Sequence, residues 1–444
     1  MTVRRLVLLA LLALPAPVLA NGAFPDTAQV LLPTDRPQTI VLGTNFGLVI
    51  SEDGGAHWRW SCEHGPAMGG YRYTFTPDQR RIVGLAGRAL VATEDLGCTW
   101  SATATKDGVF PFDFFPDRSD PAFVLGLSET LETRVDAISR VDLGQPAATP
   151  QVLFEAPPDE QLTTIESARS DPRLVYATLN PYKSGSHTRI VRSHDGGQTW
   201  TVDPIAAPTD AVDLRIAAVD PHAPGTLYFR AGTPTGQGES LVISDDAGAT
   251  ARTAFTTPGA LSALLPLVDG GVLFATIELG VGRLYRWDNG VIAEVPAHIS
   301  PRGFAERAGE VYAATDNLTD GFALARSPDG GRTWARVMGF EDITGISRCG
   351  DLPGVCAATC SMLGMTGAVK PALCAAPPVA PVHEAIDAGV DAAADAGGAD
   401  AAVSSNGGGC SCGVDPFRST STFPFTTLVL LIGALRRLAA RDPS

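Results

Sequence analysis

An eight-residue motif, Ser/Thr-x-Asp-x-Gly-x-x-Trp, recurs five times along the chain without internal gaps. Its copies begin at Ser51, Thr93, Ser193, Ser244 and Ser327. Four of the six tryptophans occupy its last position, and alanine replaces tryptophan in the copy that begins at Ser244. Such recurrence restricts the chain to an architecture of repeated structural units.

The chemistry of the motif predicts a hairpin turn. An Asp side chain can accept hydrogen bonds from the backbone amides that follow it, and Gly supplies the positive φ that the turn needs. The Trp then opens the next strand and buries a large ring. A short, largely apolar strand precedes each copy, as at Gly47–Ser51, and no amphipathic helix of useful length appears before residue 350. We therefore predict an all-β domain.

The spacing of the motif predicts the number of units. The gaps between residues 93 and 193 and between residues 244 and 327 each leave room for one further unit without the motif. Residues 123–138 and 272–290 contain apolar strands that suit these two units. The total is seven units of roughly 40 to 50 residues, the size of a four-stranded propeller blade. We predict a single β-propeller over residues 24–346, with six or eight blades as alternatives.

The motifs resemble the Asp boxes of the bacterial neuraminidase repeat (BNR) propellers. This group includes sialidases, xyloglucanases, sortilin-type receptors and the photosystem II stability/assembly factor. The resemblance implies that Asp boxes are structural turns on the blade periphery, away from the substrate face. The residues then expected to determine the fold, and not to catalyse, are Asp53, Trp58, Asp95, Trp100, Asp195, Trp200, Asp246, Asp329 and Trp334. Ala251, in place of Trp, predicts looser packing of its blade.

Residues 1–20 predict a secretory signal. Arg4 and Arg5 precede the apolar segment Leu6–Leu14, and small residues end at Ala20, where we expect cleavage. The alternative, an uncleaved membrane helix, requires a longer apolar segment than the one before Pro15. Export is therefore the expectation, and it permits disulfides.

Six of the eight cysteines are disulfide candidates. Cys62 and Cys98 belong to adjacent units, and we predict a bridge between them. The other four predict a small two-disulfide module over residues 347–374, formed by Cys349, Cys356, Cys360 and Cys374. Zinc is the alternative, but the stretch has neither a Cys-x-x-Cys pair nor a nearby His.

The last 70 residues predict a tether. Residues 375–409 are rich in Ala, Asp, Pro and Gly and are expected to be a disordered linker. Cys410 and Cys412 are followed by the apolar segment Phe423–Leu435 and an arginine cluster. This order resembles myxobacterial MYXO-CTERM sorting tags, which implies processing near Cys410 by sorting machinery and attachment to the outer surface. The alternative is a poor membrane anchor with its basic residues left in the cytoplasm.

Composition and motifs leave two classes of function open. A net charge of −15 argues against a nucleic-acid partner. A sialidase would need an arginine cluster, a Tyr–Glu pair and an acid/base Asp, and the family's Arg-Ile-Pro motif is missing from the sequence. We identify no catalytic, cofactor-binding or metal-binding residue. We expect a surface-anchored, non-catalytic binding module whose protein or glycan partner occupies the propeller face or channel. The alternative is a secreted, sialidase-like glycan hydrolase.

Overall fold

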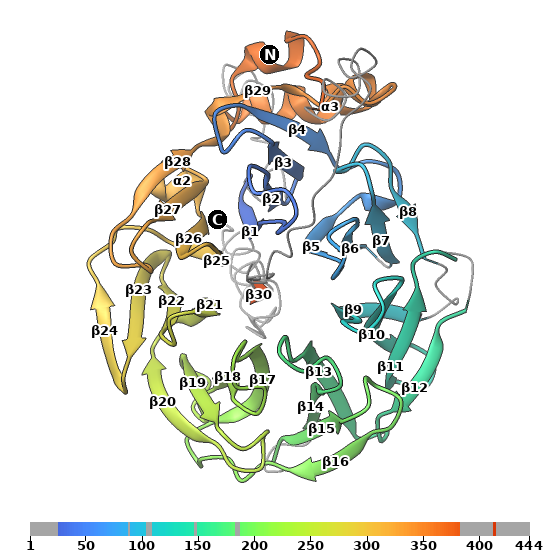
Figure 1. The fold of residues 1–444 in the computed structure, drawn as a ribbon, viewed down its shortest axis with the longest axis vertical. Coiled ribbons are helices and arrows are strands. Elements are labelled where there is room, and N and C mark those ends of the chain that lie inside the picture. Colours follow the sequence, from blue (N-terminus) through green and yellow to red (C-terminus); the bar gives the residue numbers. More distant parts are fainter. Residues whose placement is uncertain are drawn as a thin grey trace, which may run out of the picture. The chain divides into compact units, whose positions relative to one another are not determined.

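The chain forms seven β-sheets arranged radially around a central axis (Figure 1). This computed structural model describes residues 25–87, 89–103, 109–145, 149–182, 187–381 and 412–413. Each sheet contains four consecutive antiparallel strands, so the protein is a seven-bladed β-propeller, as predicted. The two units without an Asp box are blades 3 and 6.

The strands of the first four blades follow the chain from the axis outward. Blade 1 contains β1 (Thr27–Leu31), β2 (Ile40–Thr44), β3 (Gly47–Ser51) and β4 (Trp58–Cys62). Blade 2 contains β5 (Gly70–Phe75), β6 (Ile82–Ala86), β7 (Ala89–Thr93) and β8 (Ser101–Ala102). Blade 3 contains β9 (Val109–Pro116), β10 (Phe123–Thr130), β11 (Val135–Asp142) and β12 (Gln151–Glu155). Blade 4 contains β13 (Glu160–Ser167), β14 (Val175–Pro181), β15 (Arg189–Ser193) and β16 (Thr201–Pro204).

The remaining three blades repeat this order. Blade 5 contains β17 (Val212–Val219), β18 (Leu227–Gly232), β19 (Glu239–Ser244) and β20 (Arg252–Thr257). Blade 6 contains β21 (Ala260–Pro266), β22 (Val272–Glu278), β23 (Val281–Asp288) and β24 (Val291–Val295), and β21 also pairs with β30 (Cys412–Gly413). Blade 7 contains β25 (Pro301–Arg307), β26 (Glu310–Thr315), β27 (Leu324–Ser327) and β28 (Ala335–Met338).

The turns and loops that connect the strands lie on two opposite faces of the ring, because successive strands run in opposite directions. In every blade the turns between the first and second strands and between the third and fourth strands come to one face. All five Asp boxes join third and fourth strands, so we call this the box face. The loops between second and third strands, and the links from one blade to the next, come to the opposite face, which we call the loop face.

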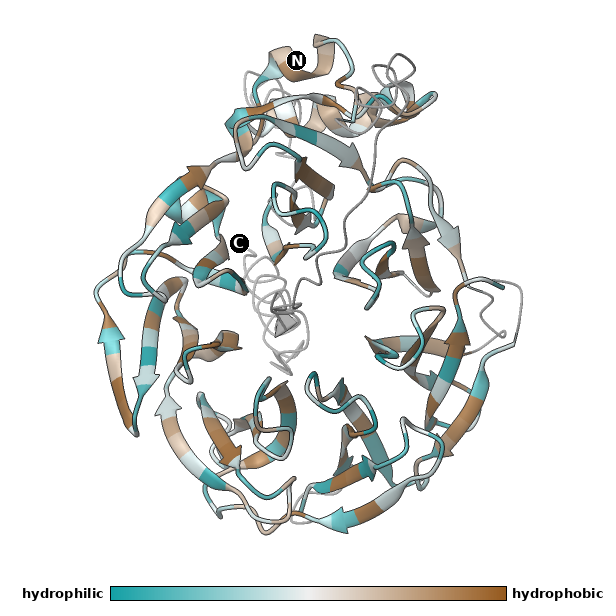
Figure 2. Cartoon of the chain, in the orientation of Figure 1, coloured by the Kyte–Doolittle hydropathy of each residue, from teal (hydrophilic) through white to brown (hydrophobic). Residues whose placement is uncertain are grey.

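Apolar side chains fill the spaces between neighbouring blades. Because a blade has a neighbour on each side, its middle strands are buried on both surfaces, and all five residues of β3 are buried. Between blades 3 and 4, Ile138 packs in one cluster with Ile165 and Leu179. Apolar residues accordingly concentrate in the strands, and hydrophilic residues in many of the turns (Figure 2).

The ring closes by addition of a strand outside blade 1. After β28 the chain passes through η2 (Phe340–Asp342) into β29 (Ile343–Ile346), which pairs in parallel with β4. Thr344 Oγ1 donates to the carbonyl oxygen of Trp58 at 2.9 Å, and Ser347 N donates to that of Trp60 at 2.8 Å. Each of blades 1 and 7 therefore builds its four-stranded sheet from its own strands.

The disulfides correct two predictions from the sequence. The three pairs are Cys62–Cys356, Cys98–Cys349 and Cys360–Cys374. The predicted Cys62–Cys98 bridge is therefore wrong, and residues 347–374 do not form a self-contained two-disulfide module. The reason is tertiary, because β29 carries the following helix α3 (Leu352–Met365) to the outer edge of blade 1.

The segment after α3 stays on the propeller. It contains η3 (Pro371–Ala375) and continues to Val379, whose N donates to the carbonyl oxygen of Ile346 at 2.8 Å. Residues 375–379, predicted as the start of a linker, therefore pack on the propeller. Ala20 and Cys410, with the rest of the predicted signal and almost all of the predicted sorting segment, lie outside the described residues. Within the described part, no helix is both long and apolar enough to cross a bilayer.

Candidate functional site

Each Asp box uses its carboxylate inside its own turn. Ser193 Oγ donates to Asp195 Oδ1 at 2.8 Å and accepts from Gly197 N at 2.8 Å. Asp195 also accepts from Thr199 N at 2.8 Å and from Thr199 Oγ1 at 2.6 Å. The other four boxes repeat this pattern. In each, the Asp carboxylate accepts from the hydroxyl of the first residue and from the amide and side chain of the seventh residue; these carboxylates are Asp53, Asp95, Asp246 and Asp329.

Sequence reasoning missed the part played by the first and seventh residues of the box, although their identities recur. These hydrogen bonds also favour the charged form of the Asp carboxyl group. The Thr199 hydroxyl and amide lower the pKa of Asp195 to about 2, and the Thr250 amide and hydroxyl lower the pKa of Asp246. A carboxylate of such low pKa, engaged by its own turn, is poorly suited to act as a general acid at neutral pH.

The box tryptophans differ in burial. Trp58 is only 2% exposed, whereas Trp100, Trp200 and Trp334 are half-buried. Trp200 lies 6.4 Å from Phe154, measured between ring centroids, and Trp334 lies 6.2 Å from Phe304. The full burial expected for Trp200 is therefore wrong.

Exposed large apolar side chains concentrate on the loop face. They come from loops or strand ends contributed by most of the ring, and Leu279 is 98% exposed and Leu318 67%. The loop-face group is Met68, Leu131, Tyr182, Val212, Leu279, Val281 and Leu318. Among the described residues, the corresponding exposed group at the box face is Val268, Val291 and Val152, which lies near the start of β12. This face is therefore the candidate surface for binding another molecule.

A second feature of the loop face is a group of carboxylates around one arginine. Arg302 Nε lies 3.3 Å from Asp26 Oδ2, and Arg302 Nη2 lies 2.8 Å from Asp316 Oδ2. Asp320 Oδ2 accepts a hydrogen bond from Ser300 N at 2.7 Å. Burial raises the pKa of Asp26 to about 7 and also raises that of Asp320. Asp26 therefore exchanges a proton near neutral pH.

This carboxylate group lacks the other parts of a sialidase site. It contains one arginine and no tyrosine. Tyrosine and glutamate do interact elsewhere: Tyr312 Oη donates to Glu310 Oε2 at 3.2 Å, and Glu63 acts on Tyr73. Tyr312 and Tyr73 are only 6% and 1% exposed and belong to the core. In the described ranges no group of three or more His, Cys, Asp or Glu side chains is arranged to hold a metal ion.

Asp26 is expected to make the folded protein less stable as the pH rises from 5 to 8. Its folded pKa of about 7 lies above the value near 3.9 of an unfolded Asp. The stabilisation is therefore complete below about pH 4 and is lost as the pH passes about 7. Asp26→Asn should flatten the dependence of the unfolding free energy on pH, measured by urea denaturation.

Two further carboxyl groups serve as comparisons for Asp26. Burial also raises the pKa of Glu63 to about 7, so Glu63→Gln should flatten the profile further. Asp195→Asn is the control and should leave the slope unchanged, since Asp195 titrates near pH 2. An unchanged slope in Asp26→Asn, or a steeper one, would contradict the assignment.

The fold and its turns define the class of this protein as a seven-bladed β-propeller. Neither a protein-family model nor a curated protein matches the sequence. Solved structures are similar in fold. A puromycin-hydrolysing peptidase from Mycobacterium tuberculosis has a TM-score of 0.50 at 11% identity, over 70% of this chain and 53% of its own. This chain thus spans about half of that peptidase.

Two further solved structures overlap this chain to a similar extent. The propeller domain of the Trilobed protease from Pyrococcus furiosus has a TM-score of 0.48 at 11% identity, over 71% of this chain and 98% of that chain. YCF48 from Cyanidioschyzon merolae has a TM-score of 0.45 at 12% identity, over 70% of this chain and 95% of that chain. At such identities these comparisons concern the fold alone.

Proposed function

We propose that this protein is a non-catalytic binding module of the Asp-box type whose loop face binds a protein partner. The observation that carries the proposal is the concentration of exposed apolar side chains on that face, from Met68 near blade 2 to Leu318 in blade 7. Burying such side chains against a partner removes apolar surface from water, which is the main favourable contribution to protein association.

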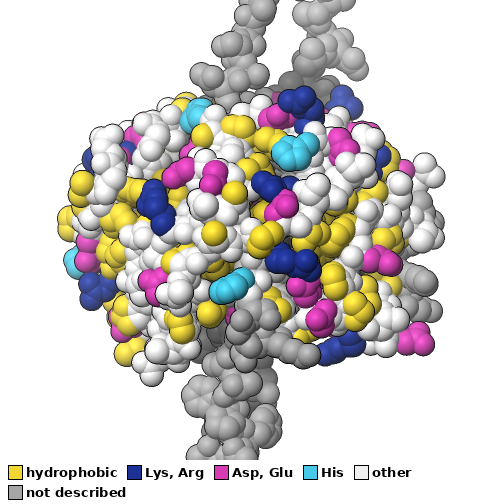
Figure 3. Space-filling view, turned by 90° about the horizontal axis from the view of Figure 1, so that it is seen from below, with side chains coloured by type: hydrophobic (Ala, Val, Ile, Leu, Met, Phe, Trp, Pro, Cys, Tyr) yellow, Lys and Arg dark blue, Asp and Glu magenta, His cyan; other side chains and the backbone are white. Residues whose placement is uncertain are grey.

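The charged groups near these side chains are largely occupied by one another, which favours binding through the apolar side chains. Several are already paired within the chain, as in Arg189 with Glu160 and Arg230 with Glu239. On the rim of the ring, acidic and basic side chains are interspersed with apolar ones (Figure 3). Neither feature offers the concentrated positive charge that a nucleic acid requires.

The proposal includes export by residues 1–20 and attachment to the cell surface by residues 410–444. Its support is the sequence alone. Cys410 and Cys412 lie between a linker and an apolar segment followed by arginines. A propeller on such a tether would be accessible to molecules outside the cell.

Site-specific photo-crosslinking on intact cells tests the loop face. A photoreactive phenylalanine analogue at Leu279 or Leu318 should give a discrete adduct with a protein, identified by mass spectrometry, because both side chains are exposed. The same analogue at Val268, 56% exposed on the box face, is the matched control and should give none. Equal adducts at the three positions, or none, would contradict the proposal.

Cell fractionation of the same strains tests the attachment. The wild-type protein should lie in the outer envelope fraction, and Cys410→Ser should release a folded protein from it. Wild-type protein that retains Ser444 and accumulates in the medium would contradict the attachment.

One observation favours the alternative, a secreted glycan-active hydrolase. Asp26, with a pKa of about 7 beside Asp316, has the ionisation expected of a general acid. Fluorogenic sialosides and neutral glycosides should report any hydrolysis, and Asp26→Asn should abolish it if Asp26 is the acid. Such a result would replace the binding module as the function.

A further inference from the structure

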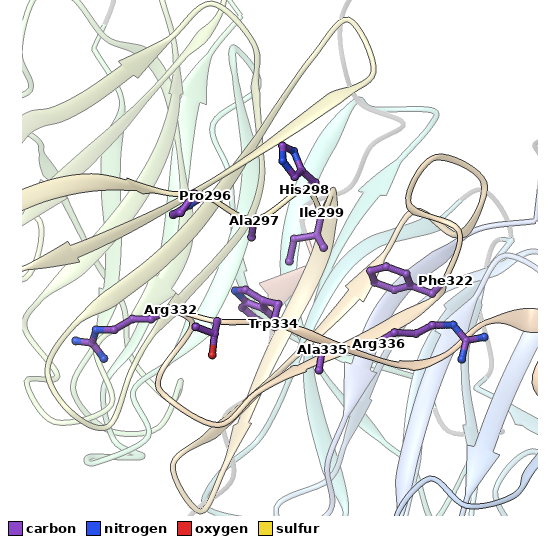
Figure 4. Close-up of a pocket in the computed structure, with 10 residues that line it drawn as sticks. Pro296, Ala297, His298, Ile299, Phe322, Arg332, Trp334, Ala335 and Arg336 are labelled. Carbon is purple, nitrogen blue, oxygen red and sulfur yellow. The ribbon is translucent and has the colours of Figure 1, made fainter.

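A pocket of about 420 Å³ opens on the flank of the ring between blades 6 and 7 (Figure 4). One wall is the link from β24 to β25, with Pro296, Ala297 and Ile299. Trp334 of the last Asp box and Phe322 supply the aromatic surface. Its volume falls within the range of small-molecule sites, about 300 to 1,000 Å³.

Next to the pocket, blade 6 presents a smaller side chain than the one that packs on the box tryptophan at another junction. At the corresponding junction between blades 3 and 4, β12 supplies Phe154, which packs against Trp200. In β24 the corresponding position is Val295, which pairs with Leu284 as Phe154 pairs with Ile138. The link that follows contributes Ala297, His298 and the buried Ile299 to the pocket. The half-buried Trp334 ring therefore remains accessible from the pocket.

Ion pairs lie on both sides of this ring. Arg332 and Arg336 flank Trp334 in Figure 4. Arg332 Nη2 lies 3.4 Å from Asp288 Oδ2, and Arg336 Nη2 lies 2.6 Å from Asp342 Oδ2. The Arg332, Arg336 and Asp288 side chains are 54%, 42% and 39% exposed, so solvent or a ligand can reach them.

These features select a ligand that is apolar on one surface and rich in hydroxyl groups at its edges. A pyranose ring stacks its C–H groups on an aromatic ring, while adjacent hydroxyls donate to a carboxylate and accept from a guanidinium. Arg332 and Arg336 are each paired with a carboxylate, so neither offers an unpaired positive charge to an acidic sugar, and His298 is the other basic side chain of the described lining. We infer that this pocket is a subsite for one ring of a neutral saccharide, separate from the loop face.

Saturation-transfer NMR of the folded propeller with neutral oligosaccharides tests this inference. Cellotetraose, mannotetraose and lactose serve as neutral probes, and sialyllactose is the acidic counterpart of lactose. We expect at least one neutral probe to bind with about millimolar affinity. Trp334→Ala should weaken its binding roughly tenfold or more. Trp200→Ala is the matched control and should retain binding, because Trp200 belongs to another junction.

A second variant separates loss of the site from loss of the fold. Ala297→Phe adds an aromatic ring at a residue that lines the pocket, so it should fill the pocket, preserve the circular dichroism spectrum and abolish saccharide binding. The inference is overturned if no neutral probe binds, if sialyllactose binds more tightly than lactose, or if Ala297→Phe still binds. The inference is also overturned if Ala297→Phe removes a protein adduct and leaves saccharide binding unchanged, because the occupant of the pocket would then be a protein.

Discussion

Removal of both disulfides that join the C-terminal segment to blades 1 and 2 is expected to lower the free energy of unfolding by about 4 to 6 kcal/mol. These bridges, Cys62–Cys356 and Cys98–Cys349, connect residues 294 and 251 positions apart. Because such long loops have high closure entropy in the unfolded chain, their cross-links restrict it strongly. The pairing of β29 with β4 and the contacts between blades 1 and 7 would then hold the ring closed.

The measurement is urea denaturation without reductant, on a variant with alanine at the four cysteines. The matched control replaces Cys360 and Cys374, which are 14 positions apart and should cost only about 3 kcal/mol. Peptide mapping of the unreduced protein should recover Cys62 linked to Cys356. Recovery of Cys62 linked to Cys98, or an equal cost for both variants, would contradict this account of ring closure.

The second large effect is expected at Trp58. Trp58→Ala should cost about 3 to 5 kcal/mol, because the ring is 2% exposed and lies in the cluster that joins blade 1 to Ile343 and α3. Its Nε1 also donates to the carbonyl oxygen of Gly55 at 3.0 Å, a bond that ties the ring to its turn. Urea denaturation followed by circular dichroism gives the cost directly.

Trp200→Ala is the comparison for Trp58→Ala. Trp200 occupies the same position of its Asp box but is half-buried, so its removal leaves a smaller cavity and should cost less. Limited proteolysis should also release the segment after β29 more readily in Trp58→Ala than in Trp200→Ala. Equal costs for the two variants would show that ring closure does not depend on Trp58.

The features that could be predicted from the sequence are those with local causes. An Asp box is a turn within eight residues, whose bonds, such as those between Ser193, Asp195 and Thr199, join near neighbours. Alternating strands precede these turns, and the interval between boxes has the length of one blade. The all-β class, seven blades and a last strand that ends at Ile346 follow from this local information.

The candidate sites required the tertiary structure. Asp26 and Arg302 are far apart in sequence, and only closure of the ring brings them to the same part of the loop face, where burial raises the pKa of Asp26. The pocket beside Trp334 depends on which side chains the neighbouring blade presents. The sequence identified Trp334 as part of a box but contained no signal for the space beside it.

By itself, the sequence determined the repeated unit, because hydrogen bonding and side-chain size within one turn and its strands suffice to specify it. The tertiary structure alone decided how the ring closes and which cysteines pair. Cys62 and Cys98 are near in sequence, yet each bonds to a residue that β29 and α3 carry back from the far end of the chain. Such a pairing depends on where the chain arrives after seven blades, and no local sequence pattern specifies that position.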